Sequence, residues 1–308
     1  SNLGQVSAPL ALSGGVLRTD AGVTIARQVE LNFSASSIDT IGFNSTITGK
    51  ITGSGRLVKY GTGVLNLRGA TNDYSGGTLI DAGTLSVTSD ANLGASSGAV
   101  ELRGGTLRTD AAISGTHPIS LVFSGGSINT NGFDSTWNGL ISGSGTLTKT
   151  GGGSLTLPGV NTYTGGTSIT GGRLSVNGSV TGPTFVDTGA TLGGNGTIGG
   201  SVTGPGHVAP GNSPGILTIN GNYTQDAASE LEIEIAKGTL PVTPGVDHDQ
   251  LRVGGTAKLL GNLNFVMYNG YIPSAGDRVR FLDTFGAGTV DLTVEPNKIS
   301  TPGLKALN

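Results

Sequence analysis

The chain has 308 residues, a net charge of −3, 56 glycines and no cysteine. The lack of cysteine excludes disulfides, thiolate metal sites and cysteine nucleophiles, and the slightly acidic balance argues against a basic surface that recruits nucleic acid or anionic lipid. No apolar run approaches the roughly 18 residues that a membrane-spanning helix needs.

The chain begins at Ser1, with neither an initiator methionine nor a pattern typical of a signal peptide. Such targeting segments are recognisable by a charged start followed by an apolar stretch. We therefore expect a segment excised from a longer protein.

One module is written twice in the part of the chain that ends at Val176. The stretch LSGGVLRTDA (Leu12–Ala21) matches LRGGTLRTDA (Leu102–Ala111) at an offset of 90, from 102 − 12. GFNST and GFDST repeat at the same offset, and YSGGT and YTGGT repeat after one deletion. Residues 12–87 and 102–176 therefore form a duplicated module, and a unit this long predicts several stacked coils.

Short runs of alternating aliphatic and small polar residues fill the module, such as VLNLRG and TLSVTS. A period of two over a few residues predicts short β-strands. Very short strands with glycine-rich corners favour a three-sided parallel β-helix over a sandwich or barrel built from hairpins. We expect coils of about 20–22 residues, about four per module and about twelve in all, stacked at about 4.8 Å.

Within each coil, aliphatic side chains should point into a narrow interior and alternate residues should point out. We expect glycine to take positive φ at the corners, and we expect Tyr74 and Tyr163, each before a Gly-Gly corner, to be corner or stacked aromatics rather than ligand contacts. The expected inward residues are Leu65, Leu67, Leu79, Leu85 and Val87, and the expected outward residues include Asn66, Thr84 and Ser86.

A catalytic site deserves consideration, because parallel β-helices also host polysaccharide lyases and hydrolases with clustered acids and bases. The acids before residue 200 are sparse, and four of them, Asp20, Asp39, Asp110 and Asp134, occupy or adjoin duplicated positions. A catalytic centre is normally single, so duplication favours a scaffold. We predict no catalytic residue, cofactor or metal site. The repeated RTDA, which starts at Arg18 and at Arg108, should be a solvated turn, with a contact patch as the alternative.

The histidines and one glycine motif offer the sharper alternatives. His248 lies between Asp247 and Asp249 and is the best candidate for a Ser–His–Asp site, but we expect an exposed loop there, and a turn around His117. The two aspartates could offer carboxylates to calcium, although the Gly-Gly-x-Gly-x-Asp calcium repeat is missing. GNGTIG (Gly194–Gly199) fits G-x-G-x-x-G without opening a helix, so we expect glycine corners rather than a nucleotide site.

The C-terminal part differs in character from about residue 240 onward. We expect it to form a cap of antiparallel character over the open strand edge of the last coil, with a hairpin at FVMYNGYIP, where Asn269-Gly270 suits a type I′ turn. In ELEIEI, Glu230, Glu232 and Glu234 share one strand face and should face solvent, with a catalytic carboxylate group as the alternative. The bulkier apolar residues of this part are Leu259, Leu260, Phe265, Met267, Tyr268, Tyr271, Phe281 and Phe285.

Four stretches carry a family resemblance. GSGTLTKTGGGSLTLPGVNTYTGGTSITGGRLSV (Gly143–Val176) and the matching stretch Gly53–Val87 resemble the passenger-associated transport repeat of Gram-negative autotransporters, the type V secretion proteins. GHVAPGNSPGILTINGNYTQDAASELEIEI (Gly206–Ile235) resembles the start of the autochaperone region in that family, and Asp247–Leu282 resembles its continuation. His207 departs from the pattern, because other residues commonly occupy its position.

The resemblance implies an all-β, right-handed three-sided parallel β-helix, displayed on or released from the outer membrane of a Gram-negative bacterium. It implies a stem over residues 1–205 and a capping, autochaperone region over residues 206–308. The family ends in a membrane β-barrel, whereas this chain ends at KALN without a series of ten-residue amphipathic strands. We expect the translocator barrel, the implied partner, to lie outside this chain.

The sequence is compatible with three functions. An adhesin that associates with other passengers is favoured, because a surface of Thr, Ser and Asn with few charges repels its own copies weakly; host glycan or matrix is the other candidate partner. A passive stalk that presents an N-terminal effector is the alternative, and a polysaccharide-active enzyme is less favoured. We expect the C-terminal part to fold first outside the cell and to template the coils before it. No contact with nucleic acid and no direct membrane insertion are expected.

Overall fold

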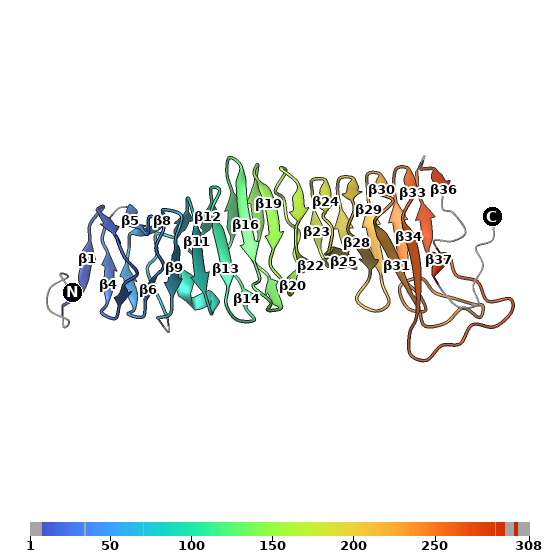
Figure 1. The fold of residues 1–308 in the computed structure, drawn as a ribbon, viewed down its shortest axis with the longest axis horizontal. Helices are drawn as coiled ribbons and strands as arrows, with labels where there is room; N and C mark the ends of the chain where they lie inside the picture. Colours follow the sequence, from blue (N-terminus) through green and yellow to red (C-terminus); the bar gives the residue numbers. More distant parts are fainter. Residues whose placement is uncertain (1–7, 34, 70, 287, 293–298, 301–308) are drawn as a thin grey trace. The chain divides into compact units, whose positions relative to one another are not determined.

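The structure, a computed structural model, describes residues 8–33, 35–69, 71–286, 288–292 and 299–300. The chain divides into two compact units, residues 1–153 with 162–165 and residues 154–161 with 166–308, which we describe separately. Both are parallel β-solenoids (Figure 1), and the described strands make about ten turns in total. Among the described residues, no helix is long and apolar enough to cross a membrane.

The first unit is built from three parallel sheets and one further strand pair, and one turn of 3-10 helix, η1 (Asp90–Leu93), interrupts it. One sheet holds β1 (Leu10–Leu12), β4 (Val29–Leu31) and β7 (Ile51–Gly53). A second holds β2 (Val16–Arg18), β5 (Ala35–Asp39), β8 (Arg56–Tyr60), β10 (Thr78–Ile80), β12 (Val100–Leu102), β15 (Ile119–Leu121) and β18 (Ile141–Gly143). The third holds β3 (Thr24–Ile25), β6 (Ser45–Ile47), β9 (Val64–Leu67), β11 (Thr84–Val87), β13 (Thr106–Thr109), β16 (Gly125–Asn129) and β19 (Thr146–Thr150), and β14 (Ser114–Gly115) pairs with β17 (Ser135–Trp137).

The strand registers of this unit agree with the expected coil length. Thr78 lies opposite Val100, and Val100 lies opposite Ile119, so the chain returns to the same sheet after a coil close to the predicted one. Stacked equivalents form rows, because Leu65, Leu85 and Leu107 follow one another in register and are all buried. The interior is therefore a column of aliphatic side chains that each coil extends.

The residues predicted to point inward are all buried, but Leu79 lies on the opposite face of its strand from the one predicted. Leu79 is buried, but it lies in register with Val58 and Glu101, whereas its neighbours Thr78 and Ile80 are in register with the buried Val100 and Leu102. Thr78 can occupy an interior position because its hydroxyl lies 2.6 Å from the buried Tyr74 hydroxyl. The predicted corner roles of the two tyrosines agree with their complete burial; Tyr163 is equally inaccessible.

Glycine corners hold the coils at close approach, as predicted. Gly53 and Gly143, at matching module positions, have φ of 106° and 111°. A Cβ atom at Gly53 would lie 2.2 Å from the Leu31 carbonyl oxygen, and one at Gly143 would lie 2.1 Å from that of Leu121. Any other residue would strain its own backbone and push the preceding coil away.

The second unit continues the same construction with three parallel sheets. One holds β21 (Thr167–Ile169), β24 (Thr184–Val186), β27 (Val202–Gly204), β30 (Tyr223–Gln225), β33 (Ala257–Leu259) and β36 (Val290–Leu292). Another holds β20 (Ser154–Leu157), β22 (Gly172–Val176), β25 (Ala190–Gly194), β28 (His207–Pro210), β31 (Glu230–Ile235), β34 (Asn262–Met267) and β37 (Ile299–Ser300). The third holds β23 (Ser179–Val180), β26 (Thr197–Ile198), β29 (Ile216–Ile219), β32 (Gln250–Val253) and β35 (Leu282–Thr284).

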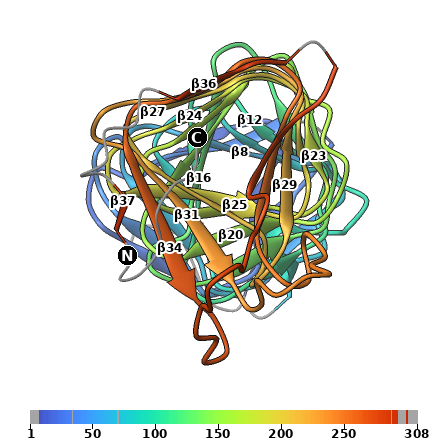
Figure 2. The same ribbon diagram turned by 90° about the vertical axis from the view of Figure 1, so that its right-hand side faces the viewer.

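Coil length changes sharply inside this unit. Thr167 pairs with Thr184, whereas Glu230 pairs with Asn262, so the later coil is nearly twice as long as the earlier one. The additional residues lie in the segments 236–249 and 268–281, which connect strands outside the sheets (Figure 2). The composition change seen near residue 240 therefore marks longer loops on a continuing solenoid.

The antiparallel hairpin expected at FVMYNGYIP is wrong. Asn262–Met267 pairs in parallel with Glu230–Ile235 along its whole length. The turn itself forms as predicted, since Asn269 and Gly270 have φ of 50° and 73° and the Tyr271 amide donates to the Tyr268 carbonyl. It leads into a loop rather than a returning strand. A capping role for residues 206–308, and their division from a stem at 1–205, stay predictions.

Candidate functional site

Polar side chains gather on the outward face of one sheet in the second unit. Strand alternation buries Leu231, Ile233 and Ile235 and turns Glu230, Glu232 and Glu234 outward, as predicted. The parallel register then places His207 opposite Glu230, and Asn264 opposite Glu232. Three neighbouring strands, β28, β31 and β34, thus contribute to one polar cluster.

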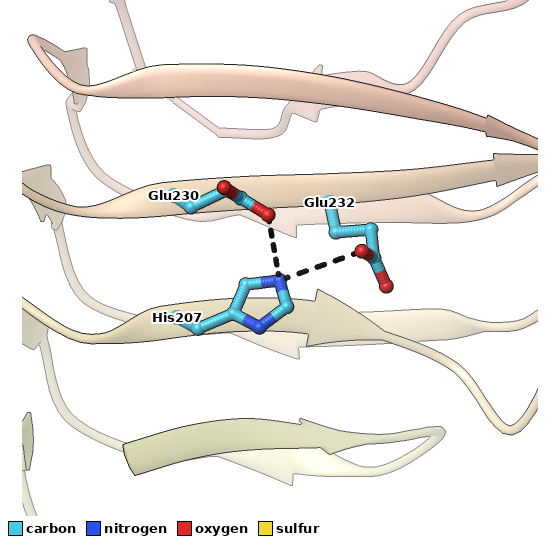
Figure 3. Close-up of side chains that lie close together, drawn as sticks. All are labelled: His207, Glu230 and Glu232. Carbon is cyan, nitrogen blue, oxygen red and sulfur yellow. Dashed lines mark ion pairs between the residues drawn. The ribbon is translucent and has the colours of Figure 1, made fainter. Parts of the chain in front are cut away.

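The centre of the cluster is His207 with two glutamates (Figure 3). The His207 Nε2 atom lies 3.6 Å from Glu230 Oε1 and 3.9 Å from Glu232 Oε2. Both distances exceed hydrogen-bond range, and the buried Nε2 atom has no hydrogen-bond partner among the described residues. The Asn264 amide donates to both glutamates, at 3.3 and 3.4 Å, and so holds the two carboxylates toward the ring. Imidazole nitrogen with carboxylate oxygen is a donor set that zinc accepts.

A polar cavity of about 230 Å³ adjoins this cluster and is lined by Arg173, Glu232, Glu234, Asp249 and the segment 209–213, the end of β28 and the residues after it. Arg173 reaches across Gly193, where a Cβ atom would lie 2.0 Å from the guanidinium. It donates to the Ser175 hydroxyl and to the carbonyls of residues 209 and 211. The missing side chain at Gly193 is therefore what lets a charged group lie flat on this sheet.

Asp249 is the most perturbed acid of the cavity. Burial, together with the charges of Glu234 and Glu232, raises the pKa of Asp249 to about 7, against two backbone hydrogen bonds that lower it. Its two carboxylate oxygens accept from the amides of Gly215 and Glu234, at 2.7 and 2.8 Å. Asp249 therefore ties a loop to a strand, and we assign it a structural role.

The loop expected around His248 is wrong in its exposure, because His248 and Asp249 are both fully buried. The His248 Nε2 atom lies 3.3 Å from the Arg280 carbonyl, and burial lowers the pKa of the ring. The Asp247 carboxylate accepts from the Thr243 amide. In a Ser–His–Asp site an acid orients the histidine toward a serine. Among the residues that the structure describes, no serine hydrogen-bonds to the His248 ring, whose Nδ1 atom has no partner there.

His117 lies in a bend between β14 and β15, in agreement with the expected turn, and its side chain is buried. Its Nδ1 atom lies 2.9 Å from Asp90 Oδ1, and its carbonyl accepts from the Trp137 indole. Burial opposes the charged form, but the hydrogen bond and charge of Asp90 outweigh it and raise the pKa of His117. This pair links η1 to the strand β17 in the first unit, which is a packing role.

The two RTDA copies differ in their surroundings. In the first, Arg18 and Asp20 form an exposed ion pair at 2.8 Å. In the second, Asp110 accepts from Arg108, Arg68, Ser86 and Asn131 on the outer face of the first unit. Burial opposes ionisation of Asp110, but the hydrogen bonds from Arg108 and Ser86 and the charges of Arg108 and Arg68 outweigh it and hold its pKa at about 2. The solvated turn predicted for both holds only for the first.

Sequence reasoning missed a second repeated surface feature. Phe33 and Phe123 occupy matching positions of the two modules, at an offset of 90 (123 − 33), and are 94% and 76% exposed. Both have positive φ, 66° and 53°, which bulky residues usually avoid. Phe43 and Phe133 repeat in the same way and are partly exposed. An aromatic residue kept at matching positions, followed by serine in both modules, was the available signal.

The GNGTIG motif forms a corner, as predicted. Gly194 ends β25 with φ of 106°, and the next strand, β26, begins at Thr197. A strand follows where a dinucleotide fingerprint would open a helix.

Comparison with known proteins gives a consistent set of relatives. The family model described as Passenger-associated-transport-repeat matches residues 57–87 and 147–176, the later part of each module. The chain is 34% identical over 213 residues to the adhesin BmaC autotransporter of Brucella suis, covering 69% of this chain and 6% of the relative. It is 43% identical over 105 residues to an extracellular serine protease of Serratia marcescens, covering 34% and 10%. It is 34% identical over 157 residues to the autotransporter lipoprotein NalP of Neisseria meningitidis, covering 48% and 13%. The chain thus spans about a tenth of the length of these curated relatives.

Proposed function

The chain belongs to the autotransporter passengers that carry passenger-associated transport repeats, and from this premise we propose that it is an adhesive segment that binds other copies of itself. Passengers of this family are displayed on, or released from, Gram-negative cells. A relative that matches 69% of the chain is named an adhesin. We propose a translocator barrel outside this chain as its first partner, and we assign the segment no catalytic step of its own.

The repeated exposed phenylalanines carry the adhesive proposal. Exposure of a large apolar side chain to water is unfavourable. Covering it with a partner lowers the free energy by roughly 25 cal/mol per Å² of apolar surface. Phe33 and Phe123 are both largely exposed and share a backbone conformation that bulky residues avoid. The guanidinium of Arg103 lies over the Phe123 ring at 5.2 Å. Retention of this costly arrangement in both modules supports a use at an interface.

Replacing both phenylalanines by serine (F33S/F123S) should weaken self-association by at least about tenfold, because each loses an apolar contact of about 1–2 kcal/mol. Sedimentation over a wide concentration range measures the association, and cells that display the full passenger are scored for clumping. Ile272→Ser is the matched control, since Ile272 is 82% exposed in the second unit. A wild-type chain that stays monomeric without clumping would refute adhesion through self-association and favour the stalk.

We also propose that residues 206–308 promote folding of the passenger as it leaves the cell. The parallel strands β31, β34 and β37 offer edges on which the preceding coils can be built one at a time. The relatives carry unlike names, an adhesin, a protease and a lipoprotein, which supports a shared role in export rather than in any one activity.

Removal of residues 209–285 should leave a passenger that is poorly exported and easily digested, because its last coil would expose apolar core and open strand edges. Surface protease resistance and the amount of passenger outside the cell report the two effects. Normal export together with full protease resistance of the truncated passenger would contradict the folding role.

A further inference from the structure

The spacing around His207 suits a bound cation better than hydrogen bonds between the ring and its two glutamates. If His207 were held by its glutamates through hydrogen bonds, its Nε2 atom would lie within about 3 Å of an oxygen. Instead, Glu230 Oε1 and Glu232 Oε2 stand off at 3.6 and 3.9 Å, and the buried Nε2 atom has no hydrogen-bond partner among the described residues. All three donor atoms lie within 4.8 Å of one another (Figure 3).

Two of the three donor separations, those from His207 Nε2, are close to the separations around one small metal ion. Zinc bonds nitrogen and oxygen donors at about 2.0–2.1 Å, and a tetrahedron with such bonds separates its donors by about 3.4 Å. The two distances from Nε2 exceed that value by a few tenths of an ångström. Closing this gap requires only small side-chain rotations.

An outer partner already orients the two carboxylates. Asn264 donates one amide to both glutamates, and its strand pairs with theirs, so the two carboxylates keep their positions despite their mutual repulsion. Such outer partners orient metal ligands in proteins. Arg173 faces Glu232 across the adjoining cavity and should temper the affinity, but its guanidinium is occupied by Ser175 and two backbone carbonyls.

We propose that His207, Glu230 and Glu232 bind one zinc ion, with the fourth position open to water. The imidazole nitrogen favours zinc over calcium and magnesium, which prefer a larger set of oxygen ligands. Because His207 lies on β28 and the glutamates on β31, the ion joins two successive coils of the second unit. Zinc binding therefore stabilises this part of the solenoid wherever the metal is supplied from the medium, an effect separate from the proposed adhesion.

Titration of zinc chloride into the metal-free full chain, followed by calorimetry, tests the site. We expect one ion per chain with a dissociation constant of about 1 μM or tighter. At free zinc of about 100 times that constant, the unfolding equilibrium constant should fall about 100-fold. His207→Gln and Glu232→Gln should each weaken binding at least about 100-fold. Glu234→Gln, an outward glutamate on the same strand, is the matched control and should change affinity less than about threefold.

A spectroscopic readout keeps the test independent of how the variants fold. The chain has three histidines, so nitrogen-15 spectra of the imidazoles can separate His207 from His117 and His248. Zinc should move only the His207 signals, and calcium chloride should not reverse the change. Absence of binding at about 1 mM zinc, equal binding by His207→Gln, a shift of another histidine, or displacement by calcium would each overturn the proposal.

Discussion

Replacing Trp137 by isoleucine should destabilise the first unit by about 2–4 kcal/mol, and adding Gly115→Ile should restore most of that loss. Trp137 is the largest buried side chain in the described residues and lies opposite Gly115 in the strand pair β14–β17. A Cβ atom at Gly115 would fall 2.3 Å from the indole ring, so the glycine exists to make room for it. At the matching positions of the first module, Ile25 lies opposite Ile47, and both are buried.

The two modules therefore fill the same interior volume in two ways. One pairs a tryptophan with a glycine, and the other pairs two isoleucines. Trp137→Ile alone leaves a cavity. Gly115→Ile alone places a branched side chain in the space that the indole ring occupies, and this overlap should cost at least about 3 kcal/mol. In the double variant the pair becomes the one already present at Ile25 and Ile47. The coupling energy between the two changes should be favourable and exceed about 2 kcal/mol.

Hydrogen exchange of peptides that span residues 114–137 measures the three variants locally, which matters because solenoid coils can unfold in parts. Ile25→Gly and Ile47→Trp, made singly and together, provide the reciprocal experiment in the first module. Additive effects of Gly115→Ile and Trp137→Ile would show that the two positions do not share one packing volume, and would contradict the expectation.

The solenoid itself could be predicted from the sequence because each coil repeats the same local rule. Alternation placed Leu65 and Leu85 inside, and glycine at Gly53 and Gly143 marked corners where a side chain would clash with the coil below. Alternation within a strand failed to predict the face of a residue where the register with the next coil decides it. Leu79 lies in register with Glu101, and no pattern within its own strand reveals this.

The candidate site was less predictable for the same reason. Glu230 and Glu232 were correctly placed on one strand face, but His207 meets them only through the register between two successive coils. His248 was expected in an exposed loop because it stands between two aspartates, yet it is fully buried and contacts the Arg280 carbonyl of a later loop. Long loops break the coil period, so the sequence offers no register for what they bring together.

Two buried lysines are a further feature that local patterns did not reveal. Lys59 and Lys149 occupy matching positions of the duplicated module and are fully buried. The Lys59 ammonium donates to the carbonyls of Tyr60, Gly61 and Ala82, at 2.7, 2.6 and 3.2 Å. Lys149 donates to those of residues 150 and 151, at 3.0 and 2.9 Å. Each lysine thus satisfies corner carbonyls that would otherwise be buried without a donor.

These lysines predict that the first unit becomes more stable as the pH rises above neutrality. Burial lowers the pKa of both from 10.5 to about 8, against the opposing charges of Asp39 and Asp134. Because the pKa of each lysine is lower in the folded chain, the folded chain releases these protons at a lower pH than the unfolded chain does. The resulting stabilisation grows as the pH rises above about 8, and it is lost as the pH falls through about 8. Linkage gives a gain of about 1.5 kcal/mol for each lysine between pH 8 and about pH 9.5.

Urea unfolding followed through the fluorescence of Trp137, the one tryptophan of the chain, measures this slope in the first unit. The double variant Lys59→Met/Lys149→Met should lose the slope, and at about pH 9.5 it should be less stable than the wild type by about 2 kcal/mol or more, because the corner carbonyls then lack donors. Lys50→Met is the control, since Lys50 is half exposed in an ion pair with Asp73. Equal slopes for the wild type and the double variant would mean that the lysines keep an ordinary pKa in the folded chain. The expected outcome, a wild-type slope that Lys50→Met retains and the double variant loses, would instead assign the pH dependence to the two repeated corners.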